Sequence, residues 1–78
     1  MISFRTLGLA YLEENKLEEA EAEFFKLIDI APKEKLGYAN LGLVYLRMGR
    51  YQEAEERLKQ AVEIDPDDPE VRLILAKI

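Results

Sequence analysis

The stretch FRTLGLAYL at residues 4–12 decides the fold, because the chain repeats it with small changes as YANLGLVYL at residues 38–46. Further identities follow at the same offset of 34 residues: Glu19, Ala20, Glu21, Ile30 and Pro32 return as Glu53, Ala54, Glu55, Ile64 and Pro66. A regular period of this length is typical of proteins that stack one structural unit on the next. The sequence therefore predicts a first unit at residues 1–34, a second at 35–68 and part of a third at 69–78.

Apolar residues within each unit recur at steps of three and four, which places them on one face of a helix. In the first unit they are Phe4, Leu7 and Tyr11, then Leu17, Ala20, Phe24, Leu27 and Ile28. The spacing predicts helices over residues 2–14, 17–30, 35–48 and 52–64, and a fifth helix that begins near Pro69. We therefore expect an all-α fold in which each complete unit is a pair of antiparallel helices.

The residues between the helices explain where each helix stops. Asn15 and Gly49 occupy equivalent positions, and both residue types tolerate the left-handed backbone conformation that closes a helix. Pro32 and Pro66 end the second helix of each unit, since the residue before a proline avoids the helical region. Asp68 is a suitable N-cap for the fifth helix.

Gly8 and Gly42 lie well inside predicted helices, where glycine costs roughly 1 kcal/mol relative to alanine. Because Gly8 and Gly42 occupy the same repeat position, we interpret both as packing residues. We expect each to face the small residue of its partner helix, Ala20 or Ala54, so that the two backbones approach closely.

The order of residues in each unit resembles the tetratricopeptide repeat: an aromatic residue, Leu-Gly, Tyr, Ala, a second large apolar residue and Pro, at matching spacings. FRTLGLAY…A…F…P and YANLGLVY…A…L…P fill this pattern twice and cover most of the chain. Phe4 and Tyr38 depart from it, because they stand where the family has Trp. The resemblance implies an α-solenoid of about two repeats, with residues 69–78 as part of a third repeat or as a capping helix.

Composition narrows the possible functions. The chain has no His and no Cys, which excludes the usual zinc sites and the Ser-His and Cys-His dyads. A net charge of −5 argues against nucleic acid as a partner, because binding to phosphates relies on clustered Lys and Arg. No apolar run approaches the roughly 20 residues of a membrane span. We expect no enzymatic activity, no cofactor, no metal, and no nucleic-acid or membrane partner, and we place the Cys-free chain in the cytoplasm.

The family resemblance implies a role in protein binding, since the first helices of such repeats line a concave groove for a peptide or protein segment. The groove residues implied here are Arg5, Leu9, Leu36, Asn40, Leu43, Leu46, Arg47, Leu73 and Lys77. Leu9 and Leu43 each lie two residues before a tyrosine of the packed face, so their side chains should point away from it. Contiguous exposed leucines mark a contact surface, whereas isolated ones are ordinary.

Charge differs between the two kinds of helix. The first helices, with the fifth, carry five basic and three acidic residues, and the second helices carry three basic and nine acidic residues. We therefore expect a mildly basic groove that favours an apolar, somewhat acidic segment, and an acidic outer face. Many of the acidic residues also lie in the N-terminal turns of their helices, where negative charge is favourable for another reason.

A second hypothesis is structural. Stacked repeats need about three units for stability, and this chain holds fewer, so it can be read as a natural or designed piece of a longer array. Its unpartnered end faces would then promote a homo-oligomer, through end-to-end stacking or exchange of the last helix. Phe25 is the candidate for self-association, because its equivalent Lys59 implies solvent; a contact with a neighbouring repeat or a partner would also explain it.

Overall fold

The computed structural model describes residues 4–77, with side chains from residue 6 to residue 77. Within this range it contains five helices: α1 (Phe4–Glu13), α2 (Leu17–Ile30), α3 (Lys35–Met48), α4 (Tyr51–Ile64) and α5 (Pro69–Lys77). The predicted all-α class is confirmed, and the predicted bounds of α2 and α3 agree with the structure. Residues 2 and 3, which the prediction placed in the first helix, lie outside the described range.

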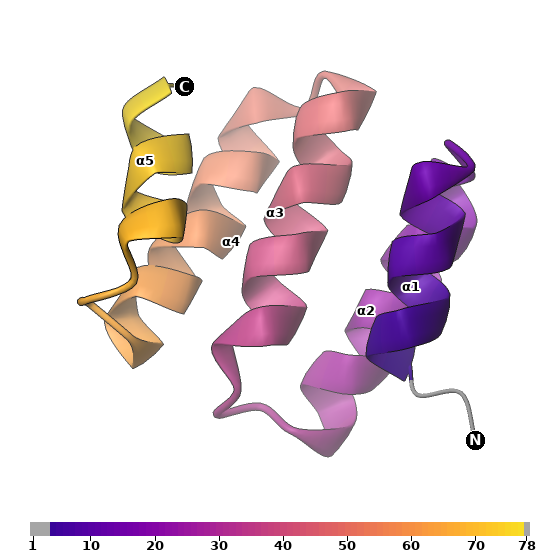
Figure 1. The fold of residues 1–78 in the computed structure, drawn as a ribbon, viewed down its shortest axis with the longest axis horizontal. Helices are drawn as coiled ribbons and strands as arrows, with labels where there is room; N and C mark the ends of the chain where they lie inside the picture. The colour runs from indigo at the N-terminus through magenta and orange to yellow at the C-terminus, as the bar shows by residue number, and fades with distance from the viewer. Residues whose placement is uncertain (1–3, 78) are drawn as a thin grey trace.

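The helices form two layers. Figure 1 shows α1, α3 and α5 nearer the viewer, α2 and α4 behind them, and α1 and α5 at opposite ends of the molecule. The hairpin partners α1 and α2 pack against each other, as do α3 and α4. In addition, α3 packs against α2 and α5 packs against α4. Each hairpin is thus joined to the next through its second helix, which is the arrangement of an α-solenoid.

The two turns within the hairpins have the same geometry, as the 34-residue period predicts. Asn15 and Gly49 adopt φ values of 62° and 80°, both in the left-handed region. The N–H of Lys16 donates to the carbonyl of Tyr11 at 2.8 Å, and the N–H of Arg50 donates to that of Tyr45 at 2.9 Å. These bonds close the helix ends as Schellman motifs. The prediction from Asn15 and Gly49 is confirmed.

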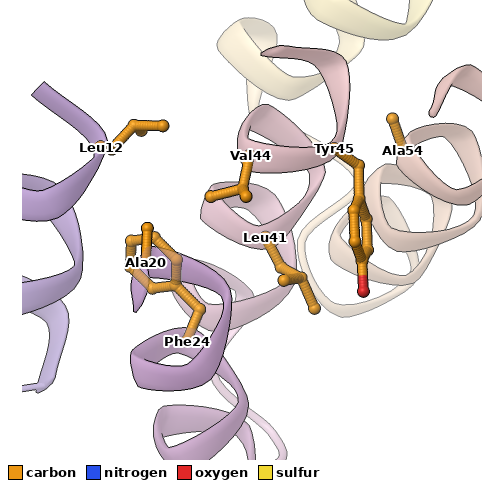
Figure 2. Close-up of a cluster of buried hydrophobic side chains, with 7 residues drawn as sticks. All are labelled: Leu12, Ala20, Phe24, Leu41, Val44, Tyr45 and Ala54. Atoms are coloured by element: carbon orange, nitrogen blue, oxygen red, sulfur yellow. The ribbon is translucent and has the colours of Figure 1, made fainter. Parts of the chain in front are cut away.

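The main core lies where α1, α2, α3 and α4 meet. Figure 2 shows its seven buried side chains: Leu12, Ala20, Phe24, Leu41, Val44, Tyr45 and Ala54. A second cluster of Leu58, Ala61 and Val71 attaches α5 to α4. The apolar stripes of the sequence therefore serve as core, and α5 is anchored mainly through Val71.

The two interior glycines are packing residues, as predicted, but their main partners differ from the prediction. A Cβ added to Gly8 would lie 2.7 Å from the Phe24 ring, and one added to Gly42 would lie 2.7 Å from Leu58 Cγ. Ala54 contributes only its carbonyl oxygen, at 3.4 Å from the Gly42 position. The reason is the hairpin register: residues equally distant from the turn lie level, so Gly8 lies level with Phe24 rather than with Ala20. Each glycine makes room for a large side chain.

Candidate functional site

We name the predicted groove surface on α1, α3 and α5 the first-helix face. It is a largely apolar strip in which some side chains are half-buried and others are exposed. Its half-buried residues are Leu9, Leu36, Asn40, Leu43 and Leu46, and its exposed ones are Arg47, Leu73 and Lys77. Leu9, Leu43 and Leu46 pack in part against the main core. Arg5 belongs to α1, but its side chain lies outside the described residues. The strip is therefore rigidly held along α1 and α3.

Arg47 has a structural role in addition to its predicted position on this face. Its Nη1 donates to the carbonyl oxygen of Leu12 at 2.9 Å, close to the C-terminal end of α1. A cation at this end of a helix is favoured by the helix dipole, and here it is a second donor to the Leu12 carbonyl beside the N–H of Asn15. The guanidinium thus ties α3 of the second repeat to α1 of the first.

Lys35 is a second cation of the first helices that is engaged within the chain. Its Nζ lies 2.6 Å from Asp65 Oδ2 and 2.6 Å from Asp68 Oδ2, in the loop between α4 and α5. This hydrogen-bonded contact lowers the pKa of both carboxyl groups and raises the pKa of Lys35. With Arg47 also engaged, the first-helix face has less free positive charge than the residue count indicated.

Asp68 links the lysine contact to the start of α5. Its Oδ1 accepts hydrogen bonds from the N–H groups of Glu70 at 2.9 Å and Val71 at 3.4 Å, as an N-cap does. Its Oδ2 binds Lys35. The predicted cap is confirmed, and it is oriented by a lysine that the sequence did not connect with it.

A hollow of about 760 Å³ lies between the turn of the first hairpin and that of the second, and the sequence reasoning did not single it out. Its lining includes Leu17, Glu18, Glu19 and Glu21 of α2, together with Met48 and Arg50. The signal was available in the repeat itself, because equivalent turns of neighbouring repeats lie at the same edge. The sequence alone relates the acidic residues at the start of α2 to the helix dipole rather than to a hollow.

Below this hollow, polar side chains of α2 and α4 meet over α3. Tyr45 is 4% exposed, and its burial, followed by the nearby Glu21 carboxylate, raises its pKa to about 12. The guanidinium carbon of Arg57 lies 5.6 Å from the centre of the Phe25 ring. Phe25, the residue associated with self-association, is 38% exposed and contacts the neighbouring repeat through this cation–π pair.

Other kinds of site find no support in the part of the chain that the structure describes. Among residues 4–77, no three His, Cys, Asp or Glu side chains are grouped so as to hold a metal ion. None of the five described helices is long and apolar enough to span a membrane.

Two hairpins with equivalent turns and equivalent glycine contacts define a helical-repeat protein of the α-solenoid class. The tetratricopeptide repeat family profile matches residues 11–78. The chain therefore belongs to the tetratricopeptide repeat family, whose members generally mediate protein–protein interactions and are generally not catalysts. No curated protein sequence matches the chain.

Proposed function

We propose that this protein is a non-enzymatic interaction module that binds a peptide or protein segment on its first-helix face. The observation that carries the proposal is the pair of equivalent leucines Leu9 and Leu43. They lie on the adjacent helices α1 and α3 and are half-buried, whereas Leu41 and Val44 on the packed side of α3 are fully buried. Leu46 extends the strip. Apolar side chains that remain accessible in a contiguous row are a contact surface.

The chemistry of this face favours an extended or helical segment with apolar side chains at regular intervals. Asn40 lies beside the leucine strip and offers an amide donor and acceptor for orienting a bound backbone. Leu73 and Lys77 on α5 extend the face at one end. Arg47 would contribute only as far as its bond to Leu12 allows. We expect this binding to take place in the cytoplasm.

The proposal is tested with a displayed library of random dodecapeptides selected on the immobilised chain. Selected peptides are then titrated against the wild type and against Leu43→Glu. We expect an affinity loss of about tenfold or more in this variant, because it places a charge in the apolar strip. Glu63→Leu, an exposed change on α4, serves as the control. Equal affinities for wild type and Leu43→Glu would refute binding on this face.

Self-association is the second candidate, and the end of the solenoid at α1 favours it. Leu7 is half-buried and Ala10 is exposed, whereas their equivalents Leu41 and Val44 are fully covered by the preceding hairpin. Two routes are open to such a homo-oligomer: end-to-end stacking, which would cover Leu7 and Ala10, and exchange of the last helix between copies. Light scattering over a dilution series tests this candidate, and a monomer at every concentration would reject it.

A further inference from the structure

The hollow between the two hairpin turns combines an apolar base with three carboxyl groups. Leu17 and Met48 both line it and pack against the main core. Glu18, Glu19 and Glu21 line it as well, and none of the three forms an ion pair within the described residues. A cavity wall of this composition attracts a cation that also carries an aliphatic stem.

The cations at the rim of the hollow are directed to other groups. Lys16 Nζ lies 3.2 Å from Glu14 Oε2, and Arg50 Nη1 lies 3.8 Å from Glu53 Oε2. Neither Glu14 nor Glu53 is among the residues that line the hollow. Their ion pairs therefore leave Glu18 and Glu19 without an ion pair among the described residues, while Glu21 interacts with the Tyr45 hydroxyl.

The same face of α2 already holds a guanidinium lower down. Leu17, Glu21 and Phe25 follow one another at steps of four, so they lie along one side of the helix. At the lower end of this row, Arg57 of α4 lies over the Phe25 ring. We name this row, with Met48 above and Arg57 opposite, the outer crevice. Its lower half shows that an arginine side chain fits between α2 and α4.

We infer that the hollow at the upper end of the outer crevice receives an arginine or lysine side chain from a basic segment of a partner protein. The stem of that side chain would pack on Leu17 and Met48, and its charge would contact Glu18 and Glu21. This second surface lies on α2 and the hairpin turns, away from the leucine strip of α1 and α3. It is independent of the proposed function.

A second copy of the chain is a poorer occupant than a basic partner, because its net charge has the same sign as the hollow. The chain carries a net charge of −5, and nine of the acidic residues lie on the second helices. Placing two such surfaces together would bring like charges into contact. A basic partner supplies the complementary charge instead.

The test uses a fluorescein-labelled peptide, acetyl-Ala-Arg-Leu-Arg-Ala-amide, and the same peptide with Gln in place of both Arg residues. Binding is followed by fluorescence anisotropy at low and moderate salt, because surface ion pairs weaken as salt rises. Glu21→Gln and Glu18→Gln each remove one carboxylate from the hollow. Glu63→Gln removes the same charge from an exposed site at the far end of α4 and is the matched control.

We expect Glu21→Gln or Glu18→Gln to weaken arginine-peptide binding about tenfold, and Glu63→Gln to weaken it less than twofold. Because Glu21 adjoins the buried Tyr45, Glu18→Gln is the decisive variant if Glu21→Gln fails to fold. Leu43→Glu should leave this binding unchanged, which separates the inference from binding on the first-helix face. Equal losses in Glu18→Gln and Glu63→Gln, or equal binding of the Gln peptide, would overturn it.

Discussion

At the scale of single residues, Gly8 and Gly42 are the positions on which hairpin packing depends most directly. Each lies where a Cβ would approach a fully buried large side chain to 2.7 Å. Phe24 and Leu58 are enclosed on all sides and cannot move aside at low cost. Glycine lowers the helix propensity at these positions, but it leaves the room that the large side chain needs to fill the core.

Replacing Gly42 with alanine tests this account. Overpacking of a core typically costs about 1–3 kcal/mol, whereas the gain in helix propensity is about 1 kcal/mol. We expect Gly42→Ala to lower the free energy of unfolding, measured by urea denaturation. In a Leu58→Ala background the clash is absent, so the same substitution should raise it by up to about 1 kcal/mol. Destabilisation of equal size in both backgrounds would contradict the packing role.

Arg47 stabilises the packing of two helices and also lies on the proposed binding face. Arg47→Met keeps the aliphatic stem but removes the donor to the Leu12 carbonyl, so we expect a loss of about 1 kcal/mol in the free energy of unfolding. Arg50→Met, in the next turn, is the control. Unchanged stability in Arg47→Met would show that its guanidinium is available to a ligand instead.

At the scale of elements, two kinds of contact hold α5 in place: apolar packing against α4, and an ion pair that comes from the start of α3. Val71 packs into the cluster of Leu58 and Ala61, where Ala61 is the small side chain that α4 offers. The equivalent contact between α2 and α3 is reversed in size, since Gly37 there meets Ile28. Lys35 adds an ion-pair link from the start of α3 to the loop before α5. Size matching and charge together select α5 as the partner of α4.

The Lys35 link makes the attachment of α5 dependent on pH. The hydrogen-bonded lysine lowers the pKa of Asp65 and Asp68 below the ordinary value of an aspartate, so the folded state favours their ionised forms. Their contribution is therefore fully present above about pH 4 and is lost as the pH falls further. We expect Lys35→Met to lower Tm at pH 7 but not at pH 2, followed by circular dichroism. An equal Tm difference at both pH values would contradict the ion-pair role.

At the scale of the whole molecule, the features that could be predicted from the sequence are those that depend on neighbouring residues and that mostly recur in both repeats. The helix bounds, the left-handed Asn15 and Gly49, and the Asp68 cap all follow from residues within a few positions of one another. The partners of Lys35, 30 and 33 positions away, and of Arg47, 35 positions away, depend on how repeats stack. The glycine partners required the register of the hairpin as well.

The two proposed binding surfaces differ in how far the sequence predicts them. The leucine strip followed from the repeat position of Leu9 and Leu43. The hollow did not, because it is formed by Leu17 and Glu21 of one repeat and Met48 of the next, and no local pattern relates them. Charge was misleading in the same way, since counting Lys35 and Arg47 as groove cations ignored their partners within the chain.

The central claim is that protein segments bind on the face formed by α1, α3 and α5. The most direct measurement is the change in backbone amide chemical shifts when the tightest peptide from the displayed library is added to the labelled protein. The account predicts the largest changes at Leu9, Asn40, Leu43 and Leu46, with α2 and α4 little affected. Changes confined to α2 and α4, with the leucine strip unperturbed, would contradict it.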